Sequence, residues 1–284
     1  MNYQHIYHAG NFADVAKHLA LLQCLDALKR KNKAFFALDT HAGRGLYDLH
    51  SSLARKTGEA QNGILRLLER GRDERALAGY FAALGARAGR SIGRYPGSAA
   101  LIGDALRPID RAVFVELRPV EARAAMRSIH SAGHIRVEAA DGYAALKAHL
   151  PPPERRGMVL IDPPYESIDE WKAMLRAFSD AYSRWPSGTF LIWYPILHAA
   201  QRRGAHERLE SLRIPKMLSA DLTIHDDAAT AVAGLAGSGL VIVNPPFGIE
   251  ETLRAAYEAV HRHLSPEGAG YVEIARLTPE RVAQ

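Results

Sequence analysis

The chain has 284 residues, of which 48% are hydrophobic and 24% are charged, and its formal net charge is +5. These values are ordinary for a soluble globular protein with one large domain or one and a half. No apolar run approaches the roughly 18 residues of a membrane span and the start is polar, so we expect a cytoplasmic protein without a membrane partner. The single cysteine, Cys24, excludes an internal disulfide and is expected to be a buried thiol.

Five apolar runs separated by amphipathic segments predict strands of a buried parallel sheet, and three further runs follow them along the chain. In chain order, all of these runs lie at 34–39, 112–116, 135–139, 158–162, 189–193, 222–225, 240–244 and 271–275. Two helices follow from apolar residues at helical spacing. These residues are Trp171, Leu175, Phe178 and Tyr182 in the first, and Leu253, Tyr257, Val260 and Leu264 in the second. The alternation predicts an α/β fold with a doubly wound, Rossmann-like sheet.

The segment before the first strand is rich in histidine, with His5, His8 and His18. No compact spacing of histidines and a carboxylate on one helix accompanies them, and cysteine ligands are absent, so we expect no metal site. Asn11 or Asp14 is expected to cap a helix in this segment. The histidines are then either ordinary polar positions or part of a segment that packs over a ligand crevice.

The first strand ends in the turn Asp39-Thr40-His41-Ala42-Gly43-Arg44-Gly45. Glycines at such a turn let the backbone approach a ligand closely. A dinucleotide fingerprint has three spaced glycines, whereas this turn has two, with His41 in the place of another. The turn instead resembles the methyltransferase pattern Asp-x-x-x-Gly-x-Gly, which predicts that Gly43 lies against the amino-acid tail of S-adenosyl-L-methionine.

The segment 51–94 lengthens the connection between the first two predicted strands. In dinucleotide-type folds the acidic end of the second strand comes about 20 residues after the glycine turn. The extra residues carry Leu77, Phe81 and Leu84 at helical spacing, so we predict a small inserted helical subdomain. The main domain is then 1–50 and 95–284. The arginines of the insert either meet nucleic acid or form an ordinary charged helix surface.

Two further strands end in acidic residues. Glu116 closes the second strand and can accept both ribose hydroxyls of a nucleotide. Asp141-Gly142 follows the third, where a carboxylate can accept from an adenine amino group or simply cap a helix. Because ligands of open α/β sheets bind beyond the carboxyl ends of strands, these residues are expected to share one crevice.

The fourth strand ends in Asp162-Pro163-Pro164-Tyr165. Asp162 and the carbonyl of Pro163 can accept both hydrogens of an exocyclic amino group, while Tyr165 offers a ring face to a base. Accepting both hydrogens draws the nitrogen lone pair out of conjugation and aims it at an electrophile. The tetrapeptide resembles the catalytic motif of amino-methyltransferases that use S-adenosyl-L-methionine, and this spelling implies adenine N6. A plain proline loop is the alternative, and the order of the motifs along the chain favours catalysis.

A second segment, Asn244-Pro245-Pro246-Phe247, also matches the amino-methyltransferase motif. Asparagine in the first position is typical of enzymes that methylate glutamine amides. The segment follows about the seventh strand, whereas the catalytic loop of this fold follows the fourth. We therefore expect Asn244 to shape a turn on the sheet edge.

The chain as a whole resembles the RlmJ family, methyltransferases of adenine N6 in 23S ribosomal RNA. The resembling segments lie at 3–18, 38–47, 57–59, 95–98, 160–166, 193–195 and 243–246. The resemblance implies a class I S-adenosyl-L-methionine-dependent methyltransferase whose tail, with Tyr3, lies near the target base. It implies cofactor contacts by His18, His41, Ser98, Glu116, Asp141, Gly142 and Asp162. The expected partner is 23S ribosomal RNA or a large-subunit assembly intermediate, and the expected state is a monomer.

Basic residues before the first and fourth strands, at 29–33 and 155–156, and again at 202–203, are candidates for phosphate contacts beside the crevice. Competing functions are an adenine-N6 DNA methyltransferase, a glutamine-amide methyltransferase using Asn244, a dinucleotide oxidoreductase and a non-catalytic RNA-binding module. The two-glycine turn disfavours the oxidoreductase, and the intact acidic ends with Asp162 disfavour the non-catalytic module.

Overall fold

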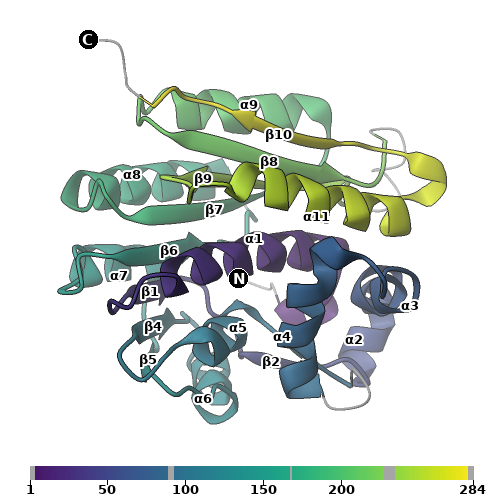
Figure 1. The fold of residues 1–284 in the computed structure, drawn as a ribbon, viewed down its shortest axis with the longest axis horizontal. Coiled ribbons are helices and arrows are strands. Elements are labelled where there is room, and N and C mark those ends of the chain that lie inside the picture. Colours follow the sequence, from purple (N-terminus) through teal and green to yellow (C-terminus); the bar gives the residue numbers. More distant parts are fainter. Residues whose placement is uncertain (1–3, 89–92, 167, 227–233, 281–284) are drawn as a thin grey trace.

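An eight-stranded sheet forms the centre of the computed structural model, which describes residues 4–88, 93–166, 168–226 and 234–280 (Figure 1). Its strand order is β5-β4-β1-β6-β7-β9-β8-β10. The strands are β1 (Phe36–Asp39), β4 (Arg111–Val115), β5 (His134–Glu138), β6 (Gly157–Ile161), β7 (Thr189–Ile196), β8 (Met217–Thr223), β9 (Gly237–Val243) and β10 (Val272–Arg276). The predicted α/β, doubly wound, Rossmann-like architecture is confirmed.

The five runs predicted as strands of a parallel sheet are confirmed, and the three strands that follow them along the chain pair antiparallel. Strands β5, β4, β1, β6 and β7 are parallel, whereas β9 runs antiparallel to both β7 and β8, and β10 runs antiparallel to β8. The apolar run of a fully buried strand reads the same in either direction, so the sequence pattern carries no information on this reversal.

Helices cover both faces of the sheet. Strand residues alternate between two apolar clusters, so that Ala37 joins α1, α5 and α11 while Phe36 and Leu38 join α7, α8 and α9. The bounds are α1 (Phe12–Lys29), α5 (Ser98–Ala105), α6 (Pro119–Ser128), α7 (Gly142–His149), α8 (Ile168–Arg184), α9 (Ala199–Glu210) and α11 (Ile249–Leu264), with 3-10 turns η1 (His5–Tyr7) and η4 (Pro266–Gly268). The predicted helices are confirmed. None in the described ranges is long and apolar enough to cross a membrane.

Two predictions for the N-terminal segment, a helix cap and a buried thiol, are confirmed. Asn11 caps α1, because its side-chain oxygen accepts from the backbone N–H of Asp14 at 2.8 Å. Cys24 is a buried free thiol on the same helix.

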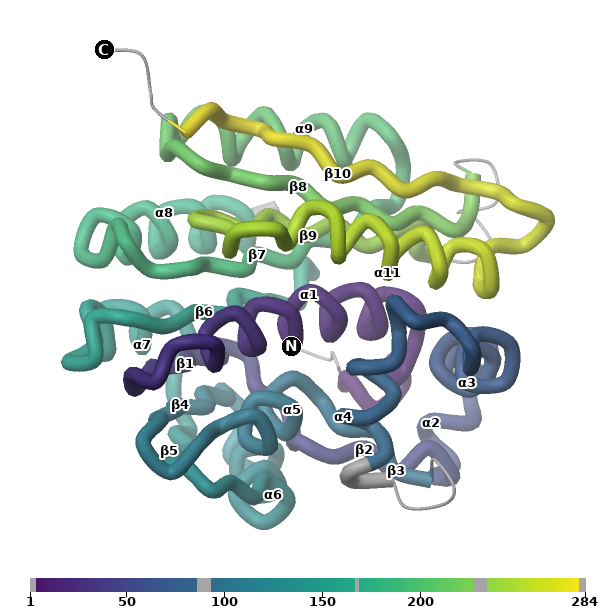
Figure 2. Tube along the Cα trace, in the orientation of Figure 1, coloured from purple at the N-terminus to yellow at the C-terminus, as the bar shows by residue number. Residues whose placement is uncertain are grey.

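Short helices fill the segment predicted as an insert. They are α2 (Ser52–Thr57), the π turn η2 (Gln61–Leu65), α3 (Arg66–Arg70), the 3-10 turn η3 (Arg75–Leu77) and α4 (Ala78–Ala88). In Figure 2 they gather together at one end of the sheet, beside α1 and α11. Their apolar residues, among them Ile64, Leu67 and Tyr80, belong to the same core cluster as α1 and α11. The division into a domain of 1–50 and 95–284 and a subdomain of 51–94 stays a prediction.

Two details of the strands differ from the prediction. Strand β8 begins at Met217 rather than near 222, because buried polar residues, Ser219 and Asp221, interrupt its apolar pattern. A separate two-stranded antiparallel sheet, β2 (Leu46–Asp48) with β3 (Arg94–Pro96), was not predicted, since each strand is only three residues long.

Candidate active site

The carboxyl ends of β1, β4 and β6 lie side by side and bring the predicted site residues to one end of the sheet. In the sheet β1 pairs with both β4 and β6, in parallel, so Asp39, Glu116 and Asp162 leave neighbouring strands in the same direction. This is where ligands bind in open α/β sheets. The structure therefore gathers at one edge the three carboxylates that the sequence places far apart.

The glycine turn after β1 is held by Glu116. The Gly43 N–H donates to Glu116 Oε2 at 3.1 Å and the Arg118 N–H donates to Oε1 at 2.8 Å. Gly43 has φ +60°, and a Cβ there would lie 2.2 Å from the Tyr47 hydroxyl oxygen, so only glycine fits. A carboxylate has about four acceptor positions, which leaves room on Glu116 for two ligand hydroxyls. Burial raises the pKa of Glu116 above its ordinary value.

Asp39, the last residue of β1, is fully buried. Its Oδ2 accepts from Ser98 Oγ at 2.6 Å and its Oδ1 accepts from the His41 N–H at 3.2 Å. Burial raises the pKa of Asp39 to about 6, although the hydrogen bond from Ser98 opposes the shift. Ser98, a predicted cofactor contact, thus holds Asp39 in this structure, and its contact with a ligand stays a prediction.

Asp141 and Gly142 begin α7 beside the glycine turn. Asp141 Oδ1 accepts from the Ala144 N–H at 2.8 Å, so the helix-cap alternative is the one observed. A Cβ on Gly142 would lie 2.2 Å from the Thr40 carbonyl oxygen, which explains glycine at this close approach of two loops. His41 lies nearby, and burial lowers its pKa to about 4, so its ring is neutral at physiological pH. The Asp141 carboxylate is exposed at the rim.

Asp162 forms an ion pair that sequence reasoning missed. Lys17 Nζ of α1 lies 2.5 Å from Asp162 Oδ2 and 2.9 Å from Asp14 Oδ1, and His5 Nε2 lies 3.0 Å from Asp14 Oδ2. Burial by itself would raise the pKa of Asp14, but His5 and Lys17 hold it well below its ordinary value. The signal in the sequence was a lysine and an aspartate spaced i, i+3 on a largely apolar helix, where a charge needs a partner.

The acceptors predicted for an amino group are open in the described part of the chain. Asp162 Oδ1 and the Pro163 carbonyl oxygen receive no hydrogen bond from any described residue, while Oδ2 is occupied by Lys17. Two acceptors on one loop match the two hydrogens of an exocyclic amine.

Tyr165 lines a cleft beside this loop. The cleft has a volume of about 480 Å³ and is bordered by Tyr165, Glu166, Trp171, His198, Ala200, Gln201, Gly204 and Arg208. The Tyr165 hydroxyl donates to the Trp193 carbonyl at 2.9 Å, and its ring centroid lies 4.7 Å from that of Trp171. The Tyr165 ring is therefore held in place against Trp171 on the wall of the cleft.

Two further residues of the predicted site are His18 and Tyr3. His18 is buried in α1, where its Nδ1 lies 2.8 Å from the Tyr95 hydroxyl, and that hydroxyl lies 2.8 Å from the Tyr80 hydroxyl. Burial lowers the pKa of His18 to about 3. His18 thus links α1 to α4, and a contact with the cofactor stays a prediction. Tyr3 falls outside the described residues.

Asn244 lies at the opposite end of the sheet from Asp162. Because β9 is antiparallel to β7, its last residue, Val243, pairs with Phe190 at the start of β7. Asn244 Nδ2 donates to the carbonyls of Pro186 and Gly188 at 2.8 Å each, so its amide fixes this turn. The turn prediction was right, but its place on the sheet edge was wrong, since β9 lies between β7 and β8.

The basic group at 29–33 and 155–156 also lies at the wrong end for the predicted phosphate contacts. These residues precede β1 and β6, at the amino ends of the strands. Arg156 donates to the Lys33 carbonyl at 3.1 Å, and Arg107 donates to the carbonyls of Lys31 and Lys33. Arg202 is paired with Asp221 and Glu273 at 2.5 Å each. No group of metal-ligating side chains occurs among the described residues.

Comparisons with known proteins agree over nearly the whole chain. The family described as "Ribosomal RNA large subunit methyltransferase D, RlmJ" matches residues 32–277. The "Ribosomal RNA large subunit methyltransferase J" of Haemophilus influenzae is 36% identical over 282 residues, which cover 99% of this chain and 100% of the relative. The protein of the same description from Escherichia coli is 35% identical with the same coverage. A crystal structure of a Legionella pneumophila protein superposes with a TM-score of 0.86 at 31% identity, over 95% of this chain and 98% of that chain.

Proposed function

The chain belongs to the RlmJ family of ribosomal RNA large subunit methyltransferases, and from this premise we propose that it methylates N6 of an adenine in 23S ribosomal RNA with S-adenosyl-L-methionine. The observation that carries the proposal is the loop after β6. Asp162 Oδ1 and the Pro163 carbonyl lie together on that loop, without a donor among the described residues, beside the glycine turn and Glu116.

The residues at the carboxyl edge fit S-adenosyl-L-methionine. Glu116 can accept from the two ribose hydroxyls, since each of its oxygens uses one acceptor position on a backbone N–H. Gly43 keeps the turn free of side chain where the amino-acid tail would pass. Asp141 would accept from the adenine amino group, and His41 would pack beside it. The cofactor supplies a methyl carbon already activated by its sulfonium.

The protein's part in the reaction is positioning and charge stabilisation. Lys17 holds Asp162 through Oδ2, so Oδ1 would accept from a second donor. Asp162 and Pro163 would accept the two N6 hydrogens, and Tyr165 would stack on the target base after it leaves its helix or loop. As N6 gains the methyl group it becomes cationic, and the Asp162 carboxylate stabilises that charge and can take the released proton.

The same site would serve an adenine in DNA, so the polymer rests on family membership rather than on the crevice. A glutamine-amide methyltransferase is disfavoured, because Asn244 uses its amide to hold the turn at the other end of the sheet. An action on ribosomal RNA also agrees with the expected cytoplasmic location. The monomeric state stays a prediction.

The test is transfer of labelled methyl from S-adenosyl-L-methionine to unmodified 23S RNA, genomic DNA and a protein extract, followed by digestion to nucleosides and amino acids. We expect the label in N6-methyladenosine from the RNA. Label confined to DNA would favour the second candidate, and label only in methylglutamine would overturn the assignment of Asp162.

A further inference from the structure

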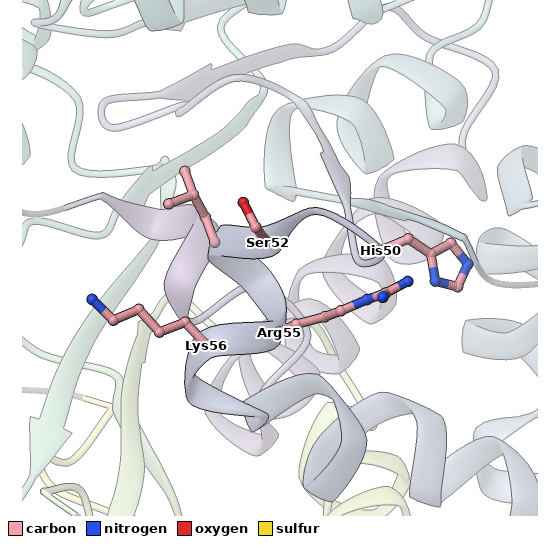
Figure 3. Close-up of a pocket in the computed structure, with 5 residues that line it drawn as sticks. His50, Ser52, Arg55 and Lys56 are labelled. Carbon is pink, nitrogen blue, oxygen red and sulfur yellow. The ribbon is translucent and has the colours of Figure 1, made fainter.

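A shallow hollow of about 620 Å³ lies on α2, outside the candidate active site (Figure 3). It is lined by His50, Ser52, Leu53, Arg55 and Lys56. Arg55 extends toward the His50 ring, while Lys56 extends to the other side of the helix (Figure 3). The hollow thus presents cationic side chains to solvent over the width of α2.

The positive charge of this hollow is not neutralised within the described part of the protein. Arg55 and Lys56 are both exposed, and neither forms an ion pair or side-chain hydrogen bond with a described residue. The neighbouring Glu59 already binds His8 and Asn11. Asp48 accepts from the His50 N–H at 2.8 Å and lies opposite Arg94 in the β2–β3 pair.

Four arginines elsewhere in the described part of the chain are held by carboxylates. Arg44 pairs with Glu121, Arg107 with Asp110, Arg111 with Glu154 and Arg202 with Asp221. The guanidinium groups of these four arginines already form ion pairs. Arg55 and Lys56 form none with a described residue, so their charge is available to a ligand.

Packing ties the hollow to the rim of the active site. Helix α2 contacts η1, where Thr57 Oγ1 donates to the Tyr7 carbonyl. From η1, His5 reaches Asp14, the partner of Lys17, and its ring lies 5.0 Å from that of Tyr47. Tyr47 belongs to β2, and His50 follows shortly after that strand ends. A polymer with one base in the crevice would pass close to α2.

We propose that the hollow on α2 binds the sugar-phosphate backbone of the RNA next to the target adenine. The identity of the polymer rests on the proposed function. Arginine and lysine are the side chains that bind phosphates, and the Ser52 hydroxyl can add a hydrogen bond. Leu53, 38% exposed, offers an apolar contact to a sugar. Such contacts fix the register of the strand and supply affinity without reading sequence.

The test compares two double variants that remove the same charge. R55A/K56A alters the hollow, and R30A/K31A removes two exposed cations at the amino end of the sheet. Filter binding of a labelled, unmodified 23S RNA transcript is measured at several salt concentrations, with retention of S-adenosyl-L-methionine and thermal unfolding as checks on the fold. R55Q/K56Q, which keeps long side chains, serves as a second variant of the hollow.

We expect R55A/K56A and R55Q/K56Q to raise the Kd for the RNA about 10-fold and to reduce the salt slope by about 1 for each phosphate that the variant no longer binds. R30A/K31A should leave both values near those of the wild type. An unchanged Kd in the hollow variants, or an equal loss of affinity in the control, would overturn the proposal. Because binding is measured apart from methyl transfer, an inactive wild type would refute the proposed function and still leave this comparison decisive.

Discussion

Two loops of this protein have similar sequences and lie at opposite ends of the same sheet. Asp162-Pro-Pro-Tyr follows β6 at the carboxyl edge, where the carboxylate meets Lys17 and leaves one oxygen open. Asn244-Pro-Pro-Phe follows β9 at the other end of the sheet, where the carbonyls of Pro186 and Gly188 accept hydrogen bonds from the amide. Strand direction alone separates them, since β9 is antiparallel to β7.

The difference shows what makes such a motif chemically useful. At the carboxyl ends of the parallel strands, the loop with Asp162 lies near Glu116 and the glycine turn, so that a methyl donor and an amino group could meet there. At the opposite end of the sheet Phe247 is 97% exposed and Asn244 adopts φ +52°, which are features of a structural turn. A motif in a sequence therefore becomes a site only when the topology brings its partners to it.

The largest difference in turnover is expected between the two single variants Asp162→Asn and Asn244→Gly. We expect Asp162→Asn to slow methyl transfer by on the order of 100- to 1000-fold, because the developing charge on N6 loses its stabilising carboxylate. Asn244→Gly tolerates the left-handed backbone and should keep turnover while losing some stability. Single-turnover transfer to 23S RNA measures both. Loss of turnover in the Asn244 variant alone would reverse the comparison.

Removing Lys17 tests the buried pair that supports Asp162. Lys17→Met leaves Asp14 buried with one cation fewer, and we expect a loss of about 4 kcal/mol in the free energy of unfolding. Adding Asp14→Asn should recover part of this loss, since the uncompensated charge is then gone. Urea unfolding of the two single variants and the double variant measures the coupling. A loss below about 1 kcal/mol in Lys17→Met would contradict the geometry.

Asp39 makes the free energy of unfolding depend on pH. Its pKa is raised to about 6 in the folded protein, so the folded state binds a proton that the unfolded state releases. Stability from this group is present at low pH and is lost as pH rises through about 6, by up to about 3 kcal/mol. Asp39→Asn should remove that dependence. The wild-type minus variant difference in unfolding free energy should fall between pH 4 and pH 7, and a flat difference would exclude the shift.

The smallest effect is expected at the link between the N-terminal segment and the insert. His8 Nδ1 lies 2.8 Å from Glu59 Oε1, and this hydrogen bond raises the pKa of His8 above 6.5. The contribution is full below pH 6.5 and disappears as pH rises through the folded pKa. His8→Gln should therefore cost less than about 1 kcal/mol at pH 6 and nothing at pH 9. Thermal unfolding at the two pH values measures it, and an equal cost at both would contradict the account.

Much of the architecture could be predicted because the central strands are short apolar runs that end in polar residues. Glu116, Asp141 and Asp162 each follow such a run, and the parallel direction of β4, β5 and β6 brings them to the same end of the sheet. The reversal of β9 could not be predicted, because burial on both faces hides strand direction. The pairing of Lys17 with Asp162 was equally hidden, since it depends on how α1 packs across the sheet.

The basic residues show the same limit. Lys33 and Arg156 looked available in the sequence, but the structure places them at the amino ends of the strands, and the Arg156 guanidinium is bonded to the Lys33 carbonyl. Arg55 and Lys56 were not predicted to contact phosphate, and they lie exposed on α2. Charge in a sequence can be counted, but its availability depends on folded partners.

The most direct test of the central claim is a crystal structure with S-adenosylhomocysteine and a short RNA that contains the target adenine. The account predicts ribose hydroxyls on Glu116 and the adenine N6 within hydrogen-bond distance of Asp162 Oδ1 and the Pro163 carbonyl. A base bound at Asn244, or a cofactor away from Glu116 and Gly43, would contradict it.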